Sequence, residues 1–287
     1  MKTRRIGPFT VSAIGLGAMP MSIEGRPSRD QAIATVRAAL EAGVNLIDTA
    51  DAYHQPGEPP GHNELLVAEA LALAGTKGVL VATKGGHYRP DSGQWLVDGR
   101  PEHLAQAARD SAKRLGVEAI DLYQFHRPDP RVTFADSVGA FQRLLEDGVI
   151  RYAGLSNVDN DQIAVAKGIL GDKLVSVQNQ YSPSAARDAA AIPYCGELGL
   201  AYIPYRPLGG LSAAYRDGGD YSRFAQVGAR HGVSPQAACL AWLLAHGPNV
   251  VPIPGSSRPA TIIDSATAGD VALTAEDLDI LAGDGDE

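Results

Sequence analysis

Short apolar runs rich in β-branched residues alternate with longer amphipathic stretches from one end of the chain to the other. This alternation is typical of parallel strands that are joined by crossover helices. Two runs that are apolar throughout, at residues 79–81 and 250–251, fit strands buried on both faces. The pattern predicts eight strands, at residues 13–17, 44–49, 78–84, 120–126, 150–156, 175–180, 201–205 and 250–254.

Helical periodicity and capping residues fill the intervals between these strands. Ser28 can cap a helix that Gly43 ends, and Pro101 opens a helix that ends at Gly116. The expected helices span residues 29–42, 63–74, 101–116, 134–147, 160–170, 185–198 and 234–246. Eight strands in alternation with helices predict a closed α/β fold, the (β/α)8 TIM barrel. A segment at residues 2–11, which turns at Gly7-Pro8, predicts an N-terminal β-hairpin before it.

Length and composition agree with a single folded unit. The 287 residues suit one barrel, and no linker rich in proline or glycine divides them, so we expect a single domain over residues 1–287. Hydrophobic residues make up 45% of the chain and charged residues 20%, as in ordinary globular proteins. Cys195 and Cys239 have no neighbours at metal-ligand spacing, and we expect both to be reduced and packed.

Charge and hydropathy narrow the range of partners. The formal net charge of −8 argues against broad attraction to nucleic acid or to anionic lipid. No run reaches the roughly 18 apolar residues that a membrane span needs. The apolar stretch after the charged N-terminus is broken by Gly7 and Pro8, unlike a signal peptide. We therefore expect a cytoplasmic protein without nucleic acid or membrane partners, present as a monomer or a weak homo-oligomer.

Ionisable residues end three consecutive predicted strands, where a barrel places its reacting groups. Asp48 lies at the end of the strand at 44–49, Lys84 ends the next strand, and His126 ends the one after. Tyr53 lies five residues beyond Asp48, in the loop that follows the first of these strands. Taken singly, each has an ordinary structural explanation: a helix-capping aspartate, a lysine on the rim, a packed histidine. Together on successive strands they predict four groups that converge on one mouth.

These segments resemble the signature sequences of the aldo-keto reductase superfamily, in the same order and with similar separations. Within the superfamily, the chain resembles the bacterial members with a short C-terminal tail. The resemblance covers nearly the whole chain. It rests on residues 48–53 (DTADAY), 83–84 (TK), 121–126 (DLYQFH), 154–157 (GLSN), 178–182 (QNQYS), 205–210 (YRPLGG) and 252–256 (PIPGS). It implies an oxidoreductase that reduces aldehydes or ketones to alcohols by hydride transfer from a nicotinamide dinucleotide.

The resemblance also assigns roles to the three strand-end residues and to Tyr53. Tyr53 would be the general acid, and Lys84 would lower the pKa of its phenol. Asp48 would hold the lysine ammonium in place. His126 would orient the substrate oxygen and help to hold the developing alkoxide.

The same resemblance implies a cofactor site. Ser156, Asn157 and Gln178 would surround the nicotinamide carboxamide, and Tyr205 would stack on the ring. Arg206, Leu208 and Gly210 would follow the pyrophosphate. No Gly-x-Gly-x-x-Gly follows a strand, so a Rossmann-type site is not supported.

The residues expected around the adenosine part of the cofactor differ from the family pattern. Many relatives carry a lysine, an arginine and a Glu-Asn pair where this chain has Gly255, Thr261, Asp264 and Ser265. Arg258 remains and can pair with a 2'-phosphate, in a loop with Ser256 and with Asp264 nearby. We therefore favour NADP(H) as the cofactor, with NAD(H) left open.

The substrate side is less specific, and two other functions stay open. Tyr88 and Trp95 in the loop at 85–100 either cover a small-molecule carbonyl substrate or pack on the rim, and Met19 can face the mouth. Family members with channel-associated roles suggest a dinucleotide-binding regulatory subunit with little turnover. Metal-dependent hydrolysis is the other alternative, with His54, His62, His87 and His126 as possible ligands. The residues around these histidines do not form a convincing set of metal ligands.

Overall fold

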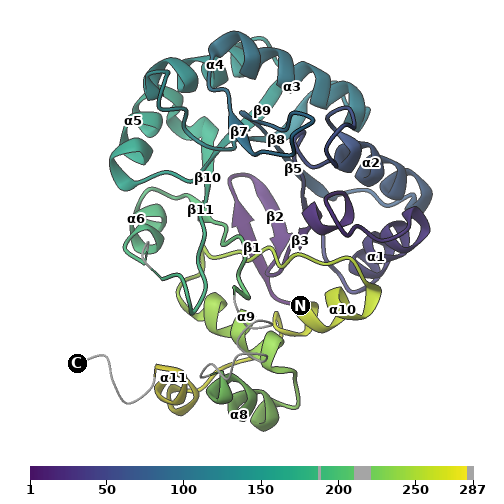
Figure 1. Cartoon of the computed structure of the whole chain (residues 1–287). Coiled ribbons are helices and arrows are strands. Elements are labelled where there is room, and N and C mark those ends of the chain that lie inside the picture. Colours follow the sequence, from purple (N-terminus) through teal and green to yellow (C-terminus); the bar gives the residue numbers. More distant parts are fainter. Residues whose placement is uncertain (187–188, 210–220, 283–287) are drawn as a thin grey trace.

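The computed structural model describes residues 1–186, 189–209 and 221–282 of the chain. A curled parallel sheet forms its centre, and a ring of helices surrounds it (Figure 1). Within the described residues the sheet has seven strands, and every neighbouring pair is parallel. Their spatial order is β3 (Leu16–Gly17), β4 (Leu46–Asp48), β5 (Leu80–Gly85), β8 (Ile120–Phe125), β9 (Ile150–Ser156), β10 (Leu174–Gln178) and β11 (Ala201–Tyr202).

Residues 250–255 close the barrel between β11 and β3, where the sequence predicts the eighth strand. The amide of Gly17 donates to the carbonyl of Pro254 at 3.0 Å, and the amide of Gly15 to Pro252 at 3.0 Å. Because neither proline has an N–H to return, the ladder cannot be completed and the segment stays irregular. The predicted (β/α)8 barrel is confirmed, with a last strand that consists of isolated bridges.

The N-terminal hairpin lies across one end of the barrel, in the middle of the ring in Figure 1. Its strands β1 (Thr3–Ile6) and β2 (Phe9–Ser12) pair antiparallel, as predicted. Gly7 takes the left-handed conformation with φ +53° that this tight turn requires. Ile6 and Val11 are buried with residues of the barrel strands, so the hairpin closes the end opposite the polar strand ends.

Helices on the outside cover the sheet. Ser28 caps the first by accepting a hydrogen bond from Gln31, and Gly116 ends the third with φ +69°. Short 3-10 turns lie at Met19–Met21 and Gly171–Lys173. The helices are α1 (Arg29–Glu41), α2 (His62–Ala74), α3 (Pro101–Leu115), α4 (Phe134–Glu146), α5 (Asn160–Leu170), α6 (Ala191–Glu197), α8 (Ser222–His231), α9 (Pro235–Ala245), α10 (Pro259–Thr267) and α11 (Ala275–Ala282).

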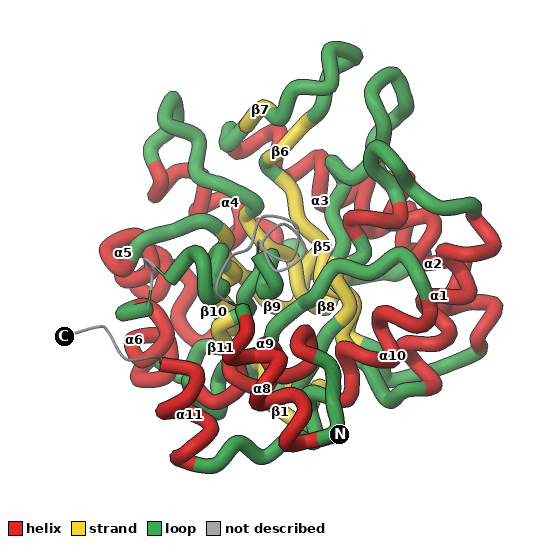
Figure 2. Tube along the Cα trace, turned by 60° about the horizontal axis from the view of Figure 1, so that its bottom comes forward, coloured by secondary structure: helices red, strands yellow, loops and turns green. Residues whose placement is uncertain are grey.

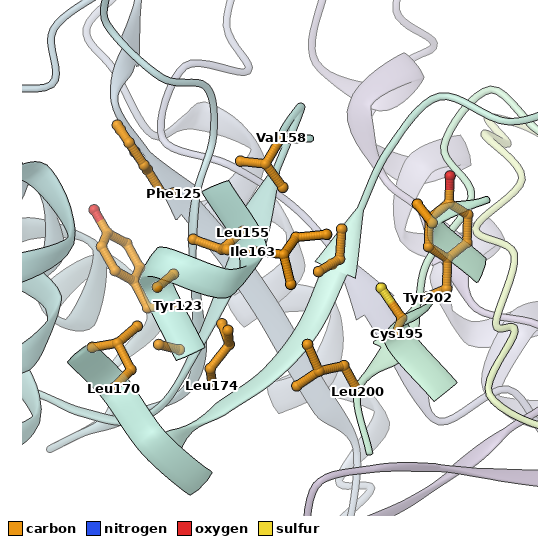
Figure 3. Close-up of a cluster of buried hydrophobic side chains, with 14 of the residues drawn as sticks. Tyr123, Phe125, Leu155, Val158, Ile163, Leu170, Leu174, Cys195, Leu200 and Tyr202 are labelled. Atoms are coloured by element: carbon orange, nitrogen blue, oxygen red, sulfur yellow. The ribbon is translucent and has the colours of Figure 1, made fainter. Parts of the chain in front are cut away.

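The largest apolar cluster lies between the strands and the helices that cover them. Figure 3 shows its members from β8 to β11 and the helices between them, among them Tyr123, Phe125 and Leu155. Cys195 packs in this cluster, and both Cys195 and Cys239 are buried and free, as expected. The cluster fixes the positions of β8 and β9, whose far ends carry candidate site residues.

The structure corrects some of the expected elements. Of the helix expected at 185–198, the structure has α6 at Ala191–Glu197; Ser182 and Ala185 pair with each other in a turn, and residues 187–188 lie outside the described part of the chain. Helices α8, α10 and α11 were not expected. The loop after β5 holds a second hairpin, β6 (His87–Tyr88) and β7 (Leu96–Val97), which rises beyond the end of β5 in Figure 2. Strands of two residues are too short to leave a periodic signal in a sequence.

Candidate active site

Four predicted residues converge at the carboxyl end of the barrel. Asp48 is the last residue of β4, Lys84 lies at the end of β5, and His126 follows β8 directly. Tyr53 reaches the same place from the loop after β4. All four side chains are buried, Lys84 completely and the others to more than nine tenths.

Lys84 lies at the centre of this group. Its Nζ donates to Asp48 Oδ1 at 2.5 Å, to the carbonyl of Thr49 at 3.0 Å and to Tyr53 Oη at 3.3 Å. These three acceptors use all the N–H donors of an ammonium. Burial lowers the pKa of Lys84, but Asp48 and then Tyr53 outweigh it, so its pKa lies above the usual value. The lysine therefore carries its charge at neutral pH.

Two glutamines hold the other oxygen of the Asp48 carboxylate. Gln178 Nε2 donates to Asp48 Oδ2 at 2.7 Å, and Gln124 Nε2 donates to the same oxygen at 3.1 Å. Gln178 was expected beside the cofactor carboxamide, and here its amide nitrogen faces the aspartate. Gln124 was not expected in the site; its position two residues before His126, on the same strand, was the available signal. The carboxylate is thus satisfied on both oxygens.

Two opposing effects act on the pKa of Tyr53. Burial has the larger effect and raises the pKa above the ordinary value for tyrosine, whereas Lys84 acts to lower it, as expected. The reason is that the phenol is almost completely removed from water, which penalises the phenolate more than one ammonium at 3.3 Å compensates.

His126 is a neutral histidine packed among aromatic rings. Its ring lies edge to face with Tyr53, at 5.7 Å between centroids, and with His87 at 4.3 Å. Its Nδ1 is buried and has no hydrogen-bond partner in the described part of the chain. Burial, and then His87 and Lys84, lower its pKa well below the ordinary value. The imidazole can donate one hydrogen bond without carrying charge.

A cavity of about 730 Å³ opens at this end of the barrel. Met19 and Trp95 face it, as the sequence suggested, whereas Tyr88 packs against His103 outside its lining. Trp95 lies 6.3 Å from the Tyr53 ring and 4.4 Å from the guanidinium of Arg89. The lining comprises Gly17, Met19, Pro20, Ile23, Asp48, Tyr53, His87, Trp95, Val97, His126, Arg127, Ser156, Asn157, Gln178, Tyr205, Arg206, Ile253 and Gly255.

Asn157, directly after β9, contacts the segments that follow β8 and β11. Its Oδ1 accepts from Tyr205 Oη at 2.6 Å and from Arg127 Nη2 at 2.8 Å. Its Nδ2 donates to the carbonyl of His126 at 2.9 Å and to Ser156 Oγ at 3.0 Å. The backbone of Asn157 is left-handed, with φ +59°, which asparagine tolerates better than most residues. The amide thus holds Tyr205 and Arg127 at the mouth.

The remaining candidate cofactor residues are spread along the rim. Arg206 lines the cavity, with Leu208 packed on apolar neighbours behind it. Gly210 lies outside the described residues. Ser256 directly follows Gly255, which lines the cavity. The hydroxyl of Ser256 donates to the carbonyl of Arg258 at 3.0 Å. Ser256, Arg258 and Leu208 therefore lie beside the cavity, not in its lining.

Arg258 and Asp264 differ in what their side chains contact. Arg258 is exposed just before α10, and no carboxylate of the described residues lies within ion-pair distance of it. Asp264, on α10, accepts a hydrogen bond at 2.7 Å from Ser234, the residue that caps α9. The Asp264 carboxylate thus connects two helices at the place where we expected a cofactor contact.

Among residues 1–186, 189–209 and 221–282, no group of three or more histidine, cysteine or carboxylate side chains is arranged to hold a metal ion. Within the same ranges, none of the helices combines the length and the apolar character that crossing a membrane requires.

The chain is similar to known proteins over nearly its whole length. The model of the aldo/keto reductase family matches residues 13–283. Pyridoxine 4-dehydrogenase of Escherichia coli is 32% identical over 98% of this chain and 97% of its own length. The glycerol dehydrogenase structure from Gluconobacter oxydans is 28% identical with a TM-score of 0.83, covering 98% of this chain and 95% of that one. An aldo/keto reductase from Klebsiella pneumoniae, solved with NADP and acetate, is 26% identical with a TM-score of 0.78, covering 96% and 93%.

Proposed function

This chain belongs to the aldo-keto reductase family, and on that premise we propose that it reduces small aldehydes or ketones to alcohols with NADPH. The observation that carries the proposal is the Lys84 ammonium, held by Asp48 at 2.5 Å and directed at Tyr53 Oη at 3.3 Å. A buried cation beside a phenol stabilises the phenolate that forms when the phenol gives up its proton.

The cavity fits a nicotinamide dinucleotide. Ser156 and Gln178 present a hydroxyl and an amide group at one wall, next to the aromatic ring of Tyr205, and Asn157 Oδ1 holds that tyrosine at 2.6 Å. Arg206 lines the same wall, and its guanidinium makes no ion pair within the described residues, so it can meet a phosphate. When bound, the reduced dinucleotide supplies the hydride for the carbonyl carbon.

The protein then provides the proton for the carbonyl oxygen. Tyr53 keeps its proton at neutral pH, because burial raises its pKa, and is therefore in the state that a general acid needs. After transfer, the phenolate is stabilised by Lys84, whose position depends on Asp48. The proton returns to Tyr53 from solvent through the open mouth of the cavity.

His126 would orient the substrate. Its lowered pKa keeps the imidazole neutral, so it can donate a hydrogen bond to the carbonyl oxygen and does not compete with Tyr53 as an acid. Trp95 and Met19 would bound the substrate side, since both face the cavity. The preference for NADPH over NADH rests on Arg258, an exposed cation that can bind the 2'-phosphate of NADPH. Kinetic constants with NADPH and with NADH test this preference.

The test is consumption of NADPH with a simple aromatic aldehyde, followed by the loss of NADPH absorbance. We expect steady turnover by the wild type and a loss of about 100-fold or more in Tyr53→Phe, the usual scale of general acid catalysis. The dissociation constant for NADPH should stay within about twofold in this variant. Undiminished turnover in Tyr53→Phe contradicts the role of Tyr53. Tight NADPH binding without any turnover by the wild type would instead favour the regulatory subunit.

A further inference from the structure

The charged groups that line the cavity are unevenly distributed. Its lining contains the carboxylate of Asp48, which is neutralised by Lys84 at 2.5 Å. It also contains two guanidinium groups, those of Arg127 and Arg206. The mouth therefore has a positive balance, although the chain as a whole has a formal charge of −8.

These two arginines differ from most others in the described part of the chain. Arginines elsewhere usually lie against a carboxylate, as Arg131 does with Asp129 at 2.9 Å and Arg100 with Asp98 at 2.6 Å. Arg127 lies within the same loop as Arg131, yet no carboxylate of residues 1–186, 189–209 and 221–282 is within 4.0 Å of it. Its side chain is exposed to the mouth.

One contact holds Arg127 in place and leaves the rest of its donors available. Its Nη2 donates to Asn157 Oδ1 at 2.8 Å. A guanidinium has five N–H donors in a planar fork, and that fork matches the two oxygens of a carboxylate. Arg127 and His126, the group that would orient the substrate oxygen, line the same cavity.

From this placement we propose that Arg127 is a specificity-determining residue that selects carbonyl compounds bearing a carboxylate. The proposal rests on the proposed reductase function. The carbonyl would face Tyr53 and His126, and the carboxylate would lie against Arg127 at the mouth. Arg206 is the less suitable partner, since it lies next to Tyr205 on the wall that we assign to the dinucleotide.

A matched pair of substrates isolates the charge. 4-Carboxybenzaldehyde and 4-formylbenzamide have nearly the same shape, and only the first is anionic at neutral pH. We expect the wild type to favour the carboxylate by about tenfold or more in kcat/KM, as a charge-assisted hydrogen bond allows. Arg127→Gln should lose most of that ratio, and Arg127→Lys, which keeps the charge without the fork, should retain part of it.

Two further variants serve as comparisons. Arg143→Gln removes an exposed arginine on α4, away from the cavity, and should keep the wild-type ratio. Arg206→Gln should weaken NADPH binding and leave the ratio between the two aldehydes in place. A wild-type ratio in Arg127→Gln overturns the proposal. So does a ratio that disappears in Arg206→Gln alone, and so does a wild type that shows no preference.

A binding measurement separates this inference from the proposed function. Calorimetry with the corresponding alcohols, 4-(hydroxymethyl)benzoate and 4-(hydroxymethyl)benzamide, needs no turnover. Tighter binding of the benzoate, lost in Arg127→Gln, supports the carboxylate site even if no aldehyde is reduced, in which case only the reductase function fails. Equal binding of the two alcohols by the NADP-loaded wild type contradicts the carboxylate site.

Discussion

The ammonium of Lys84 lies 3.3 Å from the phenol oxygen of Tyr53, and both groups are buried at the carboxyl end of the barrel. The lysine is the only cation within hydrogen-bond distance of that phenol in the part of the chain that the structure describes. In the proposed reaction, this distance links the proton transfer to the carboxylate that holds the lysine.

Removing the lysine charge should damage both activity and stability. In Lys84→Met the carboxylate of Asp48 remains buried without its counter-ion, and breaking such a pair costs about 3–5 kcal/mol of unfolding free energy. Turnover of an aldehyde should fall by about 100-fold or more. The double variant Asp48→Asn/Lys84→Met should recover part of the stability and none of the activity. Urea denaturation and initial rates measure the two effects; activity that returns together with stability would show that Lys84 only supports the fold.

Asp51 should make the protein less stable as pH rises. Burial, and then the nearby Glu64, raise the pKa of Asp51 well above its usual value, and its Oδ1 has no hydrogen-bond partner among the described residues. The folded state thus holds a proton that the unfolded chain releases above about pH 4, so stability declines as pH rises from there toward the folded-state pKa. Asp51→Asn should stabilise the protein at neutral pH by about 0.5–2 kcal/mol, and this gain should shrink toward pH 4.

Asp110 is the matched control for Asp51, because both line the same small second cavity. Hydrogen bonds from Gln106 and Lys113 lower the pKa of Asp110. Its contribution therefore has the opposite sign, and Asp110→Asn should give no stabilisation at neutral pH. Thermal unfolding across a pH series distinguishes the two variants. An Asp51→Asn variant no more stable than wild type at pH 7 would contradict the assignment.

Gly85 should not tolerate a side chain, and the reason can be tested with a second substitution. A Cβ at Gly85 would lie 1.9 Å from the hydroxyl oxygen of Tyr123, which is buried and without a hydrogen-bond partner among the described residues. Gly85→Ala should cost about 1–3 kcal/mol, as overpacking does. Tyr123→Phe removes the clashing oxygen and should restore part of that stability in the double variant. Strictly additive effects in denaturant titrations would show that the two positions do not interact.

Arg258 should determine the choice between the two dinucleotides. Arg258→Gln should weaken NADPH binding by about tenfold or more, because a charge-assisted contact with the 2'-phosphate is lost. Binding of NADH, which lacks this phosphate, should change little. Arg143→Gln, an exposed arginine on α4, should affect neither. Fluorescence titration gives both constants, and an equal loss for NADPH and NADH would place Arg258 outside the phosphate site.

Local pattern was enough to predict the barrel and the three polar strand ends. Parallel strands that are buried on both faces must be apolar, so Asp48, Lys84 and His126 stand out where each run ends. Because all strands of such a barrel point the same way, their ends meet at one mouth. Irregular and very short elements gave no comparable signal, which is why the β6–β7 hairpin and the late start of α6 were missed.

The sequence by itself therefore determined that Asp48, Lys84 and His126 gather at the mouth, since strand direction alone brings them together. Only the tertiary structure decided how they interact. The two glutamine contacts to Asp48 and the contacts of Asn157 with Tyr205 and Arg127 depend on distances between segments that are far apart in the chain. The pKa of Tyr53 depends on the balance between burial and a neighbouring charge, and that balance exists only once the folded chain has excluded water from the phenol.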